Sequence, residues 1–142
     1  MSREVAIQYA RSLLGVKWQH RGRTPWAVDC VGLVYLSLKA GGVEVEDETH
    51  YGREPWRDSL QEKLHRRFGA PIPESRWDIG DIAVFKSPER GPSHVALLGD
   101  YRYGGFSLIH SRNCRVKKCV VEHVLDDRWR RLLVEVYTPW AT

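Results

Sequence analysis

The spacing of apolar residues changes once along this chain, near Gly69, and this change constrains the fold more than any other feature. Before it, apolar residues recur three and four positions apart, which predicts helices over residues 5–14, 30–40 and 56–68. After it, short apolar runs separated by Gly, Pro, Asp and Asn predict strands at residues 81–86, 93–98, 106–111, 115–123 and 131–138. Connections this short cannot contain crossover helices, so we expect an antiparallel sheet in an α+β domain.

The size and composition of the chain exclude several classes of protein. Its 142 residues suit one domain, so we expect residues 1–142 to form a single unit. With 42% hydrophobic and 28% charged residues the chain is globular rather than disordered. The longest nearly apolar run, Cys30 to Leu38, is too short to span a membrane. The first residues lack the apolar core of a signal peptide, so we expect synthesis in the cytoplasm.

One of the three cysteines stands where a nucleophile is expected. An odd number of cysteines (Cys30, Cys114 and Cys119) argues for free thiols rather than a disulfide framework. Cys30 follows Asp29, a good N-cap, and is therefore predicted to be the first residue of a helix. At that position the helix dipole and unpaired N–H groups favour the thiolate. The alternative is a thiol that is simply buried at a helix start.

Two histidines are predicted to meet across a hairpin. The turn at residues 100–105 predicts that residue numbers paired across the hairpin sum to about 204–206. His94 and His110, which sum to 204, should therefore lie opposite each other, or nearly so, on two antiparallel strands. Such a pair would supply a general base for Cys30 and the group that orients this base. Two separate, partly exposed histidines and a zinc-binding pair are the alternatives. Because no third or fourth ligand stands at metal-like spacing, we expect neither a metal nor a cofactor.

The basic residues are less informative. Arg21 and Arg23 lie on the segment that leads to Cys30 and are candidates for binding substrate carboxylates; a solvated basic loop is equally compatible. A net charge of +4 and clusters of arginine raise nucleic-acid binding as another hypothesis. The chain lacks the Gly-rich loop, zinc knuckle or aromatic strand motif of the known nucleic-acid readers. We therefore expect neither nucleic-acid binding nor membrane insertion.

Several motifs resemble the NlpC family of papain-like cysteine peptidases. They are the segments GVKWQHRGRT at 15–24, VDCVGL at 28–33, GDIAVF at 80–85, SHVAL at 93–97 and LIHS at 108–111. These blocks follow the family order and span nearly the whole chain. The resemblance implies a papain-like fold, in which the nucleophile begins a helix and a roughly five-stranded antiparallel sheet follows.

The same resemblance implies an activity and assigns roles to residues. Members of this family cleave peptidoglycan stem peptides, typically at the γ-D-glutamyl bond to a diamino acid. By resemblance, Cys30 would attack the scissile carbonyl, His94 would act as the base, and His110 would orient His94. Trp18 stands where many members have a substrate-facing Tyr, and Asp29 matches a position thought to meet the substrate amine.

The wording Trp-x-x-x-Gly-Arg before the cysteine resembles the branch found in phage tails and gene transfer agents. This implies phage-tail proteins as partners and a virion or tail location from which the chain reaches the cell wall. Two alternatives remain open. One is a non-catalytic tail assembly component with the same fold, and the other is a different amide hydrolase or acyl transferase on this scaffold.

Overall fold

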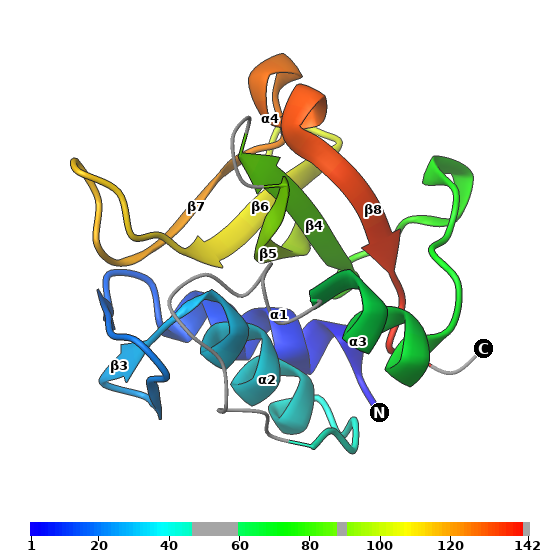
Figure 1. Ribbon diagram of the computed structural model, residues 1–142. Helices are drawn as coiled ribbons and strands as arrows, with labels where there is room; N and C mark the ends of the chain where they lie inside the picture. The colour runs from blue at the N-terminus through cyan, green and yellow to red at the C-terminus, as the bar shows by residue number, and fades with distance from the viewer. Residues whose placement is uncertain (47–59, 88–90, 141–142) are drawn as a thin grey trace.

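The computed structural model describes residues 1–46, 60–87 and 91–140, and it contains helices on two sides of a five-stranded sheet (Figure 1). The helices are α1 (Arg3–Ser12), α2 (Cys30–Ala40), α3 (Leu60–Phe68), the 3-10 turn η2 (Glu74–Arg76) and α4 (Asp127–Leu132). The strands are β1 (Lys17–Trp18), β2 (Arg23–Thr24), β3 (Ala27–Val28), β4 (Ile82–Ser87), β5 (Gly91–Asp100), β6 (Phe106–Ser111), β7 (Val120–Val124) and β8 (Leu133–Tyr137). The α+β class predicted from the sequence is confirmed.

The main sheet has the strand order β7-β6-β5-β4-β8, and every neighbouring pair is antiparallel. This confirms the prediction made from the short connections. The β5–β6 hairpin pairs Leu97 with Ile109 and Leu98 with Leu108. The register therefore lies within the predicted range. It brings the first half of β5, which contains His94, close to the end of β6, which contains His110.

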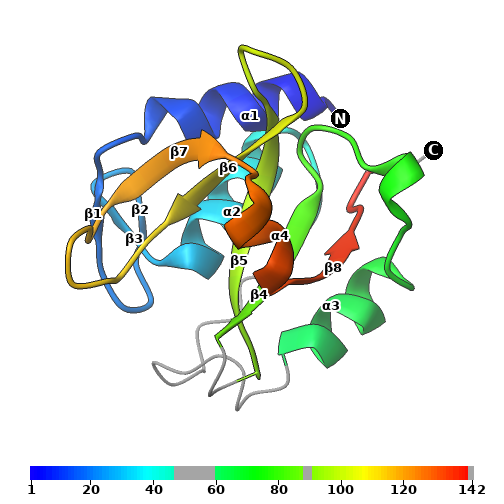
Figure 2. The ribbon, with the colours of Figure 1, turned by 90° about the horizontal axis from the view of Figure 1, so that it is seen from above.

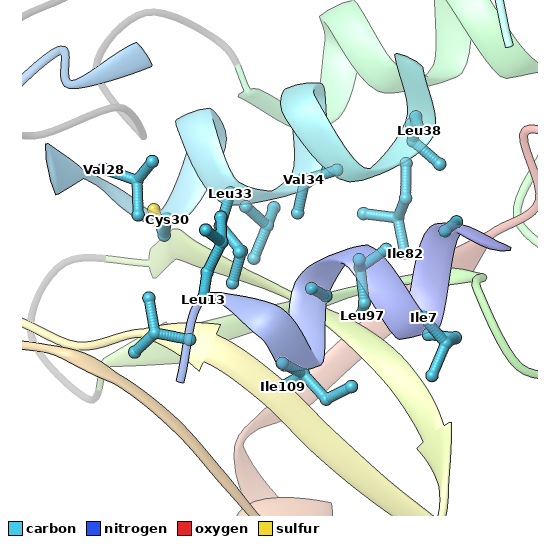
Figure 3. Packing of buried hydrophobic residues seen from close by; sticks show 14 of the residues in the cluster. Ile7, Leu13, Val28, Cys30, Leu33, Val34, Leu38, Ile82, Leu97 and Ile109 are labelled. Carbon is cyan, nitrogen blue, oxygen red and sulfur yellow. The ribbon is translucent and has the colours of Figure 1, made fainter. Parts of the chain in front are cut away.

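One face of the sheet packs against α1 and α2, and the other carries α4 (Figures 1 and 2). Apolar side chains of α1, α2, β4, β5 and β6 form the main core, which includes Cys30 (Figure 3). A second apolar cluster lies on the opposite face and includes Phe85, Leu98, Leu108 and Val136, with Trp129 of α4 packed against it. The sheet is thus buried on both faces. None of the described helices is long and apolar enough to cross a membrane.

The structure corrects three local predictions. The strand predicted from residue 131 begins only at Leu133, because the two residues before it belong to helix α4. Asp126 caps this helix by accepting a hydrogen bond from the backbone N–H of Trp129. The strand predicted from residue 115 begins only at Val120, because a tight turn closes between Cys114 and Lys117. Residues 17–28, for which no helix or strand was predicted, contain a small sheet of order β1-β3-β2. The start of the third predicted helix, at residues 56–59, lies outside the described residues.

Candidate active site

The N-terminus of α2 is held by Asp29, which precedes Cys30. Asp29 as a whole is 3% exposed, and its carboxylate accepts hydrogen bonds from the backbone N–H groups of Gly32 and Arg21, both at 2.8 Å. It also pairs with the Arg23 guanidinium, whose Nη1 lies 3.1 Å from Oδ1. The cap predicted from the sequence is therefore present. The structure adds that this carboxylate ties the helix to the segment that leads to it.

A close backbone approach explains why the first turn of α2 contains a glycine, Gly32. A Cβ atom on Gly32 would lie 2.1 Å from the backbone oxygen of Gly22 and 2.9 Å from Nη1 of Arg23. Such distances are not sterically possible, so a larger residue would force the helix away from residues 22 and 23. Gly32 thus allows the segment around β2 to lie directly against the start of α2.

The thiol of Cys30 is almost enclosed. The residue is 7% exposed, and the backbone N–H groups of Val31 and of Val95, next to His94 in β5, favour the thiolate of its side chain. Burial and the neighbouring Asp29 carboxylate raise the pKa of Cys30 to about 12, outweighing these N–H groups. The thiol is therefore neutral at pH 7 in this conformation. The expectation that the helix start would favour a thiolate is wrong here, because it took no account of tertiary burial.

His94 and His110 are brought together as the hairpin predicted. His94 Nε2 lies 2.7 Å from His110 Nδ1, and the ring centroids are 4.9 Å apart. Extended by one residue, the β5–β6 register places His110 beside Ala96, so His94 is its diagonal neighbour rather than its direct partner. Diagonal pairs of this kind are within reach of aromatic side chains.

A third histidine, which the sequence analysis did not single out, extends this pair. His110 Nε2 lies 2.8 Å from Nε2 of His123 on β7, and His123 Nδ1 donates to the backbone oxygen of Val124 at 2.9 Å. The three side chains, which we call the histidine row (His94, His110 and His123), therefore cross three adjacent strands. A strand ending in His123 was the available sequence signal, but its register against β6 was not predictable from a loop of that length.

Trp129 of α4 covers the histidine row. Its ring centroid lies 6.4 Å from that of His94, 5.1 Å from His110 and 5.2 Å from His123. Arg112 in turn lies over the Trp129 ring, 5.3 Å from its centroid. This cover excludes water from one side of the row and holds the rings in place.

Two members of the row, His94 and His110, are electrically neutral at pH 7. Burial, with the positive charge of Arg112 and the neighbouring His123, lowers the pKa of His94 to about 4. Burial, with the neighbouring His94, His123 and Arg112, holds the pKa of His110 far below its ordinary value. A neutral imidazole can accept a proton, so His94 has the protonation state that a general base requires.

The remaining predicted site residues lie on the segment before α2. Trp18 is paired in β1 with Val28 and stacks on His20, with ring centroids 6.4 Å apart. The Arg23 side chain is turned toward Asp29, as given above, whereas the Arg21 side chain is exposed. Arg21 also has a positive φ of 60°, a conformation that is uncommon for a residue other than glycine. Trp18 and Arg21 thus both lie on the segment that precedes Asp29 and Cys30 in the chain.

Among the described residues, no group of three or more His, Cys, Asp or Glu side chains is arranged to hold a metal ion. The nitrogens of the histidine row instead contact one another directly.

The chain belongs to the NlpC/P60 family, whose sequence model matches residues 15–137. Solved structures have the same fold. An NlpC/P60 family protein from Bacillus cereus ATCC 10987 superposes with a TM-score of 0.70 at 18% identity, covering 97% of this chain and 40% of that one. The NlpC/p60 domain of the peptidoglycan hydrolase SagA gives 0.64 at 22% identity, covering 97% of this chain and 99% of that domain. NlpC1 from Trichomonas vaginalis gives 0.69 at 17% identity, covering 99% and 45%.

These matches confirm the family and the fold expected from the motifs. The chain spans less than half the length of the Bacillus cereus and Trichomonas vaginalis proteins and nearly all of the SagA domain. No curated protein sequence matches it.

Proposed function

We propose that this chain is a cysteine endopeptidase that hydrolyses peptidoglycan stem peptides. The observation that carries the proposal is the position of Cys30 at the start of α2, with its thiol against the backbone of Val95, next to His94. The NlpC/P60 family supports a cell-wall substrate, since the SagA domain of similar fold comes from a peptidoglycan hydrolase.

The neutral groups at this site favour general-base catalysis over a preformed ion pair. His94 Nε2 faces His110, which leaves His94 Nδ1 as the nitrogen that takes the thiol proton. As the proton leaves, the sulfur forms a bond to the scissile carbonyl carbon, and the carbonyl oxygen becomes an oxyanion. The backbone N–H of Cys30, at the helix start, is one donor for that oxyanion. His94 then gives the proton to the leaving amine, and water hydrolyses the resulting thioester.

Two finer points form part of the proposal. The bond is the γ-D-glutamyl bond to the diamino acid, which the family resemblance supports. The chain is carried on a phage-like tail, a location that rests only on the Trp18-x-x-x-Gly22-Arg23 motif. Detection of the chain in purified tail particles tests this location, and its absence from them would contradict it.

The activity is tested by digesting purified peptidoglycan and identifying the fragments by mass spectrometry. The wild-type chain and Cys114→Ala should release stem-peptide fragments, whereas Cys30→Ala should release none. Cys114 is a suitable control because it lies in the β6–β7 turn and is not part of the core cluster that contains Cys30. Fragment masses identify the bond. Equal cleavage by Cys30→Ala would refute the mechanism, and no cleavage of several peptidoglycan types by wild type would favour the non-catalytic alternative.

A further inference from the structure

The hydrogen bonds of the histidine row determine which nitrogen of each ring carries the proton. A carbonyl oxygen only accepts, so the contact with Val124 O requires a proton on His123 Nδ1. In a neutral imidazole the other nitrogen is then an acceptor. When the His123 imidazole is neutral, its Nε2 therefore accepts from His110 Nε2, 2.8 Å away.

The same logic passes along the row to His94. With its proton on Nε2, neutral His110 offers Nδ1 as an acceptor, and the nitrogen 2.7 Å from it is His94 Nε2. His94 must therefore carry its proton on Nε2, which leaves Nδ1 as a bare lone pair. The backbone carbonyl of Val124, which is linked to His94 through His123 and His110, thus determines which nitrogen of His94 is basic.

We propose that His123 is a positioning residue that fixes His94 in the Nε2–H tautomer through His110. The inference rests on the proposed function for its effect on catalysis, but the tautomer itself is a property of the resting protein. Without an acceptor at position 123, His110 is free to donate from Nδ1 to His94 instead. His94 would then carry its proton on Nδ1, the nitrogen that has to receive the thiol proton.

Packing alone does not account for His123. Trp129 contacts the His123 ring at 5.2 Å between centroids, so a ring at this position also supports α4. A substitution that keeps the ring but removes the nitrogens separates the two roles. His123→Phe retains an aromatic ring beneath Trp129 and removes the acceptor for His110. His123→Glu removes the ring but supplies a carboxylate, which in its ionised form accepts hydrogen bonds and donates none.

The test reads the tautomers of the imidazole nitrogens by ¹⁵N NMR at pH 7.5 and measures kcat and KM on peptidoglycan fragments. Wild type should show His94 protonated at Nε2 and bare at Nδ1. His123→Phe should shift His94 toward the Nδ1–H form and lower kcat about tenfold, with KM little changed, as expected for an outer group that orients a catalytic histidine. His123→Glu should restore the wild-type tautomer and most of kcat. His65→Phe, an exposed histidine on α3, is the matched control and should change neither.

An Nδ1–H tautomer at His94 in wild type would overturn the proposal. So would a folded His123→Phe variant with an unchanged His94 tautomer. If wild type shows the expected tautomer but cleaves no peptidoglycan, the positioning role stands and the proposed substrate fails. The NMR measurement therefore separates the two proposals.

Discussion

Replacing Asp29 by Asn tests whether the buried carboxylate is what holds the start of α2. The amide oxygen of Asn still accepts from the Gly32 N–H, so the helix cap is preserved. Two of the described interactions of Asp29 are altered. The Oδ2 position becomes an NH₂ group that faces the Arg21 N–H, and Arg23 loses the negative charge 3.1 Å from its guanidinium.

The size of the effect follows from burial. The Arg23 and Asp29 side chains are 12% and 5% exposed, and breaking a pair buried to this extent costs about 3–5 kcal/mol. Arg23 keeps its hydrogen bond to the backbone oxygen of Gly22 at 3.0 Å, so we expect a loss at the lower end, about 3 kcal/mol.

Urea unfolding at pH 7, followed by tryptophan fluorescence, measures this loss. With a slope of about 2 kcal/mol per molar urea, the midpoint of Asp29→Asn should fall by about 1.5 M. Asp126→Asn is the matched control, since Asp126 caps α4 in the same way but is exposed and forms no ion pair with any described residue. It should lose no more than about 0.5 kcal/mol. The reasoning is refuted if the two variants differ by less than about 1 kcal/mol.

Three further predictions concern protonation and packing. Because the folded-state pKa values of His94 and His110 lie below that of an unfolded histidine, the unfolded chain takes up protons first as pH falls below 6.5. The free energy of unfolding should then fall by about 1.4 kcal/mol per pH unit for each histidine toward pH 4, and His110→Gln should reduce that slope in urea titrations. Iodoacetamide at pH 7 should alkylate Cys114 before Cys30, and peptide mapping would show the order. The reason is that the backbone N–H groups of Lys117 and Val116 lower the pKa of Cys114 despite the opposing effect of burial. Faster labelling of Cys30 would contradict the burial argument. Gly32→Ala should destabilise by at least about 2 kcal/mol in thermal or urea unfolding, because its Cβ meets the Gly22 backbone oxygen, and a near-neutral effect would show that the two segments separate easily.

Local patterns in the sequence were enough to predict the elements that carry the candidate nucleophile and the candidate base. The predicted span of α2 is confirmed at both ends. Asp29 before the helix and the pair Gly41-Gly42 after it are local signals that mark where it begins and ends. The proximity of His94 and His110 was also predictable. A short hairpin loop restricts the register of its two strands, and the observed pairing lies within the predicted range.

Other features depend on segments distant in the chain. His123 meets His110 only through the β6–β7 pairing, and Trp129 reaches both through α4, a short helix that the apolar pattern of residues 131–138 concealed. The protonation of Cys30 is the clearest case. The helix start, encoded locally, favours the thiolate, but the sheet packed around the thiol removes water and raises its pKa to about 12. Sequence alone thus determined where the reactive groups stand along the chain. The tertiary structure decided their charge and their hydrogen-bonding order, since desolvation and side-chain contacts arise only when distant segments pack together.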